Sequence, residues 1–314
     1  QEIWIGTAGN GVIRYDGAYR SYRTSDGLAA DNVTALAFDH VRNGLWVGTR
    51  GGLSRFDGQR WQSWKRSEGS EGLPTDEIRT LMVDRAGRVW IGTDGGGVAT
   101  FDPTLNVFQT LSWRDGLSHD TVDALLEDAQ GSIWIGTEGG LSRYRPRTNA
   151  PAIRITGMTA DGQSHTGERI EMSGRPRRVV VAFDGLSLGT HPDDMVYLCE
   201  LREGAGTQRT SDSTSEGRVP RGPDTVEEQG PNRASQSSAL REEALRAQTR
   251  YARQIEYTNL PYGQYEFRVR AVDRDLNVSA PASIKLIVHR DYAQMAMAGG
   301  LGCAVAGGLV AAGF

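Results

Sequence analysis

Cysteine is scarce in this chain of 314 residues, and the two that occur stand far apart, at Cys199 and Cys303. Their segments differ in character, so we expect no disulfide between them. The chain has no Cys-x-x-Cys pair and no mixed cysteine and histidine spacing, and its five histidines do not cluster. The usual sequence evidence for a zinc site is therefore missing. We predict no metal and no cofactor.

Lysine is almost absent as well, because Lys65 and Lys285 are the only two and the other basic residues are arginines. Together Lys and Arg number 35 against 39 Asp and Glu, which gives a formal net charge of −4. The arginines are scattered along the chain rather than gathered in a basic run. A nucleic-acid partner is therefore not expected.

Recognisable catalytic motifs are also lacking. There is no phosphate-binding loop. Residues 185–189 have the Gly-x-Ser-x-Gly pattern around Ser187, but a loop-like stretch follows where a nucleophile elbow needs a helix. Asp273, Asp275 and Asn277 alternate like the start of a calcium loop, but Val278 stands where that loop needs glycine. We interpret both segments as ordinary turns and predict no catalytic residue.

A long uncharged run occurs once, at residues 292–314. At about 1.5 Å per residue a helix here spans about 35 Å, more than the hydrocarbon core of about 30 Å. We predict a truncated transmembrane helix; the alternative is a soluble Ala/Gly helix or tail. Small residues recur in it every fourth position and would let two copies pack closely in a homodimer, unless they only reflect composition. They are Ala296, Gly300, Ala304, Gly308 and Ala312.

One short phrase, Trp-x-Gly-Thr, is present four times in the first half of the chain. Its copies begin at Trp4, Trp46, Trp90 and Trp134, at intervals of 42, 44 and 44 residues. Gly-x-x-Arg-aromatic and Asp-Gly phrases follow at similar offsets, and Asp-Gly suits tight hairpin turns. A fixed period of this size predicts β-propeller blades of four short strands.

The second repeat shows the expected strands, at about 33–39, 45–49, 52–56 and 60–65. We count two full and two partial repeats in residues 1–149, because the first lacks its opening strand and the last lacks its fourth. We therefore expect further blades before residue 1 and a fourth strand supplied by that upstream chain.

Positions at which the repeats differ are the candidates for ligand recognition. The residue after each Gly-Thr is Ala8, Arg50, Asp94 or Glu138. These positions fall in a blade turn, where loops commonly carry binding residues. We name Arg50, Asp94 and Glu138 as candidate ligand-binding residues, with solvated turns as the alternative. The recurrent aspartates Asp16, Asp26, Asp57 and Asp115 are interpreted as turn residues.

A second β-rich region without the period follows at 150–290. Its candidate strands are 153–159, 178–183, 195–201, 254–258, 264–272 and 283–288, a spacing typical of an immunoglobulin-like or fibronectin-like sandwich. An insertion at about 203–250 is poor in large apolar residues, and we expect disorder there. Its end, 238–251, has one apolar helical face, so a short helix is expected there.

The repeats resemble two-component regulator propeller repeats, through Trp-x-Gly-Thr, Gly-Leu-Ser-Arg-Tyr and Asp-Gly-Leu. Residues 257–271 and 179–188, with Tyr197, resemble the tyrosine-rich YYY domain that follows such propellers. The Leu-Glu-Gly-x-Asp-x-x-Trp stretch of that domain is missing after Tyr197, which leaves open any binding role of that loop. The whole fold expected is all-β, a partial propeller and a sandwich, followed by the membrane helix.

The resemblance implies the extracytoplasmic sensor of a one-pass bacterial receptor in the inner membrane, with residues 1–290 periplasmic or extracellular. It implies a small-molecule or carbohydrate-derived ligand, a homodimer, and a missing cytoplasmic output domain such as a histidine kinase or diguanylate cyclase. Two alternatives stay open: a propeller-based hydrolase or lyase, and a membrane-tethered adhesion or scaffold protein.

Overall fold

The computed structural model describes residues 2–66, 72–204, 248–250 and 252–290. All regular structure in these residues is β-strand, apart from three short 3₁₀ turns. The predicted all-β fold class is therefore confirmed. A helix was expected at 238–251. Where the structure describes this segment the expectation is wrong, because residues Gln248–Arg250 form strand β20, which pairs with residues 197–199. The rest of that segment, most of the expected insertion and the expected span 292–314 lie outside the described residues.

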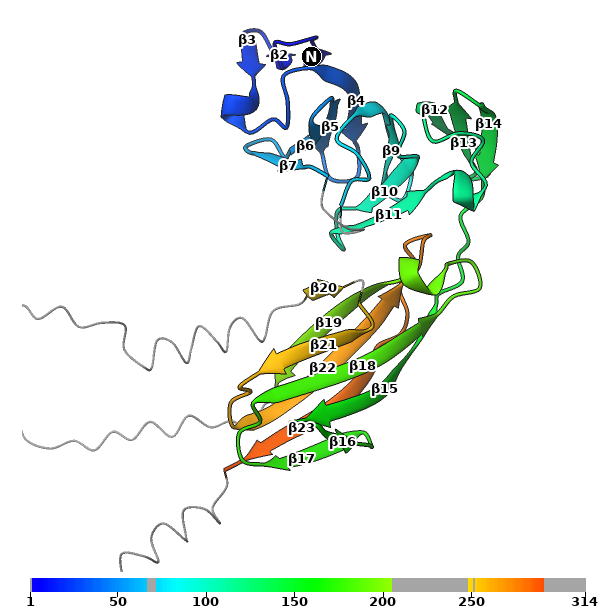
Figure 1. Cartoon of the computed structure of the whole chain (residues 1–314). Helices are drawn as coiled ribbons and strands as arrows, with labels where there is room; N and C mark the ends of the chain where they lie inside the picture. The colour runs from blue at the N-terminus through cyan, green and yellow to red at the C-terminus, as the bar shows by residue number, and fades with distance from the viewer. Residues whose placement is uncertain (1, 67–71, 205–247, 251, 291–314) are drawn as a thin grey trace, which may run out of the picture. The chain divides into compact units, whose positions relative to one another are not determined.

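The chain folds into two compact units (Figure 1). The first contains Gln1–Ala152 together with two later segments, Leu186–Val196 and Ala271–Ser279. The second contains Ile153–Gly185, Tyr197–Arg270 and Ala280–Phe314. The domain boundary that the sequence suggests near residue 150 stays a prediction.

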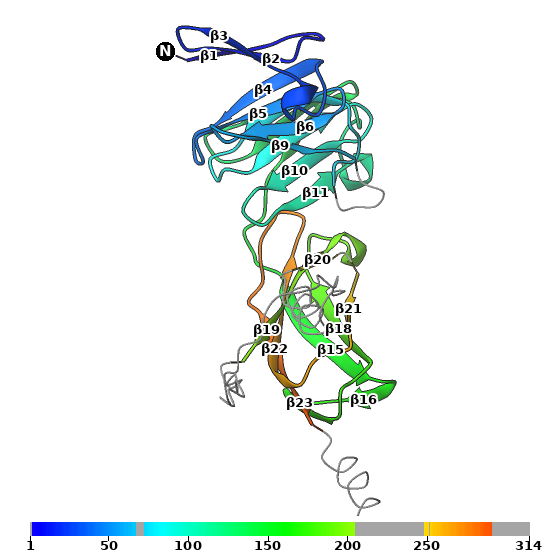
Figure 2. The same cartoon turned by 90° about the vertical axis from the view of Figure 1, so that its left-hand side faces the viewer.

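The repeats form four separate antiparallel sheets in the first unit (Figures 1 and 2). The two outer sheets have three strands each: β1 (Ile3–Gly6), β2 (Val12–Tyr15) and β3 (Tyr19–Tyr22), and β12 (Val122–Glu127), β13 (Ile133–Thr137) and β14 (Gly140–Tyr144). The two inner sheets have four each: β4 (Val33–Asp39), β5 (Gly44–Thr49), β6 (Gly52–Phe56) and β7 (Trp61–Trp64), and β8 (Ile78–Val83), β9 (Val89–Thr93), β10 (Val98–Asp102) and β11 (Val107–Leu111).

The glycine of each of the first three Trp-x-Gly-Thr phrases lets the next sheet approach closely. A Cβ atom built on Gly48 would lie 2.6 Å from Ile78 Cγ2, and one on Gly6 would lie 2.6 Å from Val33 Cγ1. A Cβ atom built on Gly92 would lie 2.8 Å from Val122 Cγ1 of the next sheet and 2.5 Å from Thr80 Cγ2 of its own sheet. Real Cβ atoms do not come this close, because interiors are packed to contact. The repeated glycine is thus a requirement of sheet-on-sheet packing.

The tryptophan of the same phrase is tied to an aspartate in the preceding turn. The indole Nε1 of Trp46 donates to Asp39 at 3.3 Å, that of Trp90 donates to Asp84 at 2.9 Å, and that of Trp134 donates to Asp128 at 3.0 Å. Trp46 and Trp90 are almost fully buried, so each large ring fills a core while its one polar atom keeps a partner.

The Asp-Gly-Leu phrases form 3₁₀ turns at Thr24–Asp26 and Trp113–Asp115. Asp26 accepts a hydrogen bond from the backbone N–H of Arg23, and Asp115 accepts one from that of Ser112. The glycines that follow have φ of 112° and 100°, which suits glycine because it has no Cβ. The interpretation of these aspartates as turn residues is confirmed.

The segment Ala271–Ser279 is held by blade residues of the first unit. The Tyr144 hydroxyl donates to the Asp275 carboxylate, Arg274 pairs with Asp115, and Arg88 Nη1 donates to the Asp275 carbonyl at 3.0 Å. Asp273 accepts from the backbone N–H of Asn277 at 2.9 Å, which closes the turn. The turn interpretation of Asp273, Asp275 and Asn277 is therefore confirmed.

The second unit is built on two sheets that share a core. One has the order β16 (Gln163–His165), β15 (Ala152–Ala160), β18 (Arg178–Leu186), β21 (Gln254–Thr258); the other has β17 (Arg169–Ser173), β23 (Ala282–His289), β22 (Gly263–Val272), β19 (Val196–Glu203), β20. Phe183 of the first sheet lies 4.9 Å from Tyr197 and 6.2 Å from Phe267 of the second, between ring centroids. Side chains of both inner faces thus interdigitate, as in a β-sandwich.

Candidate functional site

The three predicted binding residues lie at equivalent ends of successive sheets. Arg50, Asp94 and Glu138 directly follow β5, β9 and β13. The backbone N–H of each donates to a carbonyl oxygen just before the first strand of its own sheet. Arg50 donates to Asn32 at 3.1 Å, Asp94 to Glu77 at 2.9 Å, and Glu138 to Thr121 at 3.1 Å. This backbone hydrogen bond is therefore shared by all three positions, whereas the side chain varies.

A β-bulge in the first strand of each sheet adds a second variable position beside them. The strand register shifts between Val33 and Ala35, between Ile78 and Thr80, and between Val122 and Ala124. The residues that fall at the shifts are Thr34, Arg79 and Asp123. A bulge leaves its extra residue outside the ladder and re-aims its side chain.

Arg79 joins these two sets of positions. Its guanidinium lies 2.7 Å from Asp123 Oδ1, 3.4 Å from Asp94 Oδ2 and 3.7 Å from Glu138 Oε1. Partial desolvation lowers the pKa of Arg79, but the charges of the three carboxylates outweigh this and the pKa is raised. Between 37% and 52% of each of these side chains is exposed, so the pairs contribute little to stability.

A hollow of about 350 Å³ opens beside this cluster. Its lining includes Arg50, Glu77, Arg79, Asp94 and Asp123. The Arg50 guanidinium is exposed and makes no hydrogen bond or ion pair with any described residue. The hollow therefore contains the guanidinium group of Arg50, which has no ion-pair partner among the described residues. It also contains the carboxylates of Asp94 and Asp123, whose charge Arg79 partly neutralises. Such a surface can bind an anionic group at Arg50 and hydroxyl groups at the carboxylates.

The structure thus brings Asp94 and Glu138 together through Arg79, and places Arg50 in the same hollow as Asp94. Arg79, Asp123 and Glu77 were missed in the sequence. The signal for Arg79 and Asp123 is the second residue of each opening strand. This residue is Thr34, Arg79 or Asp123 and so differs among the repeats, as the turn position does.

The remaining sequence candidates do not join this site. Ser187 Oγ accepts from the backbone N–H of Gly189 at 3.4 Å, and a 3₁₀ turn, Pro192–Asp194, follows instead of an α-helix. The helix-packing set Ala296 to Ala312 lies outside the described residues. Within the described part of the chain, no helix is long and apolar enough to cross a bilayer.

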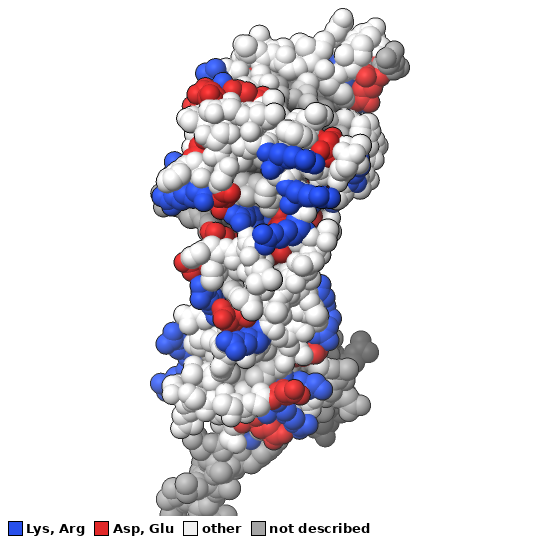
Figure 3. Space-filling view, turned by 90° about the vertical axis from the view of Figure 1, so that its right-hand side faces the viewer, with Lys and Arg blue, Asp and Glu red and all other residues white. Residues whose placement is uncertain are grey.

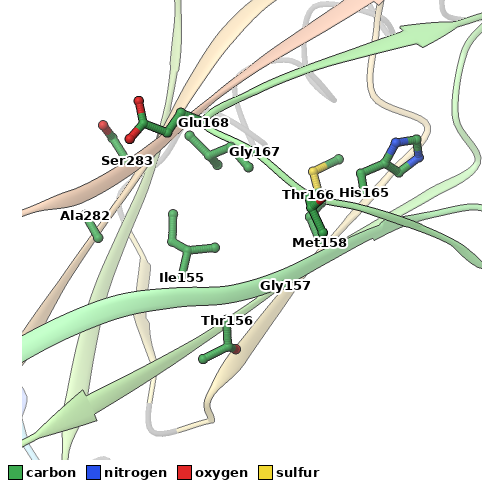
Figure 4. A pocket seen from close by; sticks show the side chains of 11 residues that line it. Ile155, Thr156, Gly157, Met158, His165, Thr166, Gly167, Glu168, Ala282 and Ser283 are labelled. Carbon is green, nitrogen blue, oxygen red and sulfur yellow. The ribbon is translucent and has the colours of Figure 1, made fainter.

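The second unit has a hollow of its own, of about 370 Å³, between β15, β23 and the β16–β17 connection. Figure 4 shows Ile155 and Met158 along its wall, with Glu168 and Ser283 near each other at one end. None of the predicted site residues lies there. Its lining is mainly apolar, and one carboxylate alone does not define a ligand.

Figure 3 shows the charged side chains on one face of the molecule. Lys and Arg side chains gather at several places on that face, with Asp and Glu side chains beside some of them. The expectation that no nucleic acid binds stays a prediction.

Known proteins provide a further comparison. Residues 72–95 and 116–139 match the two component regulator propeller family. Each matched segment runs from the Gly-Leu turn phrase to just beyond Trp-Ile-Gly-Thr, in the third and fourth repeats. The resemblance of the repeats to two-component regulator propeller repeats is confirmed. The resemblance of the second β-rich region to the YYY domain stays a prediction. No curated protein sequence matches the chain.

Two solved structures from B. thetaiotaomicron are similar over most of this chain. One is the extracellular domain of the putative hybrid two component system BT3049, with 19% identity, a TM-score of 0.42, and coverage of 92% of this chain and 36% of that one. The other is the extracellular domain of the putative hybrid two component system BT4673, with 14% identity, a TM-score of 0.36, and coverage of 94% of this chain and 56% of that one. This chain therefore spans about a third of the first structure and a little over half of the second.

Proposed function

We propose that this chain is the extracytoplasmic ligand-sensing region of a bacterial transmembrane signalling receptor of the two-component type. In this account residues 1–290 are periplasmic or extracellular, and 292–314 crosses the inner membrane. Ligand binding passes through the sandwich and the helices of a homodimer to a cytoplasmic output domain. The observation that carries the proposal is the match of two repeats to two-component regulator propellers.

The hollow at Arg50 and Arg79 supports a binding role for the blades. Variable charges converge there on an otherwise repeated backbone, and recognition commonly uses variable loops on a constant scaffold. We propose that the ligand is a small molecule, of the carbohydrate-derived class that the resemblance implies. Binding could drive signalling only if two states of the receptor differ in ligand affinity.

Reading the coding sequence past Phe314 tests the receptor proposal. A histidine kinase or diguanylate cyclase domain there supports it. A stop codon at that point would favour the membrane-tethered adhesion or scaffold alternative.

A thermal-shift screen tests the ligand site. The full chain and its Arg50→Ser variant are screened against neutral and acidic disaccharides, with Arg154→Ser as the control, because Arg154 is a highly exposed arginine of the second unit. A bound ligand stabilises the folded state by mass action. We expect at least one disaccharide to raise the unfolding temperature of the wild type and the control, and not of Arg50→Ser. Equal shifts in all three proteins, or no shift with any disaccharide, contradict the assignment.

A further inference from the structure

A second hollow, of about 570 Å³, lies between the first two sheets of the first unit and shares no residue with the hollow at Arg50. Its lining comes from β2, β3 and the Thr24–Asp26 turn on one side, and from the β6–β7 hairpin on the other. The residues are Arg14, Arg20, Tyr22, Asp26, Phe56, Gly58, Gln59, Arg60 and Trp61. Three of these nine residues are arginines, whereas one is acidic.

Two of the arginines face each other directly across a strand pair. Arg14 of β2 is opposite Arg20 of β3 in the antiparallel register. Side chains in such positions stand on the same face about 4.5–5.5 Å apart at Cβ, and like charges placed there are destabilising. A local arrangement that costs stability points to a functional demand at that place.

The carboxylates nearby do not pair with Arg20 or Arg60. Arg14 pairs with Glu2 at 3.0 Å and with Asp16 at 3.3 Å. Arg20 and Arg60 are exposed, and their guanidinium groups make no hydrogen bond or ion pair with any described residue. Asp26, the one acidic lining residue, accepts a hydrogen bond from the Arg23 backbone. The carboxylate of Asp57 in the β6–β7 hairpin is influenced by the Arg60 charge without pairing with its guanidinium group. Two guanidinium groups without an ion-pair partner among the described residues therefore border the hollow.

An aromatic wall forms the other part of the hollow. The ring centroids of Tyr22 and Trp61 are 5.5 Å apart, and those of Phe56 and Trp61 are 5.0 Å apart. Phe56 is buried, whereas Tyr22 and Trp61 are half-buried and leave ring surface at the hollow. A flat apolar body can pack on such rings while guanidinium groups bind its anionic end, since planar guanidinium matches carboxylate and phosphate geometry.

We propose that this second hollow is a further binding site, for a small molecule that carries a carboxylate or a phosphate on a flat apolar body. The oxyanion is held by Arg20 and Arg60, and the flat body lies against Tyr22 and Trp61. The site goes beyond the sensing proposal, because it uses other residues and stands or falls independently of Arg50.

Direct titration tests the site in the full chain. The indole N–H of Trp61 is followed by NMR after ¹⁵N-tryptophan labelling, with its signal among the 7 tryptophans assigned through Trp61→Phe. The probes are benzoate, phenyl phosphate, benzyl alcohol and acetate. We expect saturable shifts with benzoate or phenyl phosphate, at least about tenfold tighter than with benzyl alcohol or acetate, because only the first two carry both groups. Whichever of the two binds more tightly identifies the oxyanion as carboxylate or phosphate.

Charge-removal variants complete the test. Arg20→Ser/Arg60→Ser should weaken binding at least about tenfold. Arg154→Ser/Arg253→Ser, which changes the net charge equally in the second unit, should leave it unchanged. Arg20→Ser alone should keep or raise the unfolding temperature, because it removes a like charge opposite Arg14. Equal affinity of the two double variants, equal binding of benzyl alcohol and benzoate, or no saturable shift with either aromatic anion would overturn the proposal.

Discussion

At the scale of single residues, the glycine, tryptophan and threonine of the repeated Trp-x-Gly-Thr phrase serve packing and hydrogen bonding rather than catalysis or ligand binding. Its glycine admits the next sheet, and its tryptophan fills a core while donating to an aspartate. Its threonine hydroxyl donates to a carbonyl three or four residues on, at 2.7 Å from Thr49 to Gly52 and 2.7 Å from Thr93 to Gly97. A residue that recurs in every repeat therefore belongs to the scaffold, and function is sought where repeats differ.

Gly48 provides the sharpest test of that account. In Gly48→Ala the new methyl group meets Ile78 at 2.6 Å, and we expect a loss of about 1–3 kcal/mol in the free energy of unfolding from overpacking. Gly136→Ala is the matched control, because its methyl group meets only Ala124, with the Cβ atoms 3.3 Å apart. Urea unfolding of the full chain measures both. Equal losses in the two variants would show that sheet-on-sheet contact is not the reason for the glycine.

The ionisation of Asp128 makes the stability of the folded state depend on pH. Backbone hydrogen bonding from Ser132, helped by the Trp134 indole, lowers the pKa of Asp128 below its ordinary value of 3.8. A lowered folded-state pKa contributes stability that is present above pH 3.8 and lost as the pH falls through the folded-state pKa. Asp128→Asn should therefore show a flatter stability profile below about pH 4. Thermal unfolding between acid and neutral pH measures this; identical acid slopes for variant and wild type would contradict it.

At the scale of elements, the order and kind of strands could be predicted from the repeat because period, turn phrases and alternation all agree. The sandwich strands with strong apolar alternation, such as β18 and β22, were predicted close to their observed bounds. β16 and β17 were missed, since the three residues of β16 and the polar alternation of β17 give little signal. Arg79 and Asp123 were missed because a bulge is a property of strand pairing, which one strand's sequence does not reveal.

The turn Ala271–Ser279 shows an element whose role becomes visible in the structure alone. Asp275 is almost buried and accepts a hydrogen bond from Tyr144, which lies more than a hundred residues earlier in the chain. Burial, with the Asp275 contact, raises the pKa of Tyr144, so its hydroxyl stays a donor across neutral pH. The sequence predicts the turn but not the partner that holds it.

Removing that donor should destabilise the first unit. Tyr144→Phe leaves a nearly buried carboxylate without the tyrosine hydroxyl, and we expect a loss of about 1–3 kcal/mol in the free energy of unfolding. Tyr19→Phe is the control, because Tyr19 is 76% exposed. Chemical denaturation of both variants gives the comparison. A Tyr144→Phe variant as stable as Tyr19→Phe would show that the contact is not made in solution.

At the scale of the whole molecule, the proposed receptor uses different parts of the chain for different tasks. In that proposal the repeats supply a scaffold with variable charged positions, and the sandwich follows that scaffold in the chain and precedes the uncharged run 292–314. A recognition scaffold on one side of a membrane and an output domain on the other is the arrangement that a receptor requires. The direction in which the chain crosses the membrane is therefore the point on which the proposal depends.

Alkaline phosphatase fusions in the full gene measure that direction. The enzyme gains activity where its disulfides can form, outside the cytoplasm. We predict high activity for a fusion after Arg290 and little for one after Phe314, at equal amounts of fusion protein by immunoblot. An inactive fusion after Arg290, or equal activity at both positions, would contradict the receptor account.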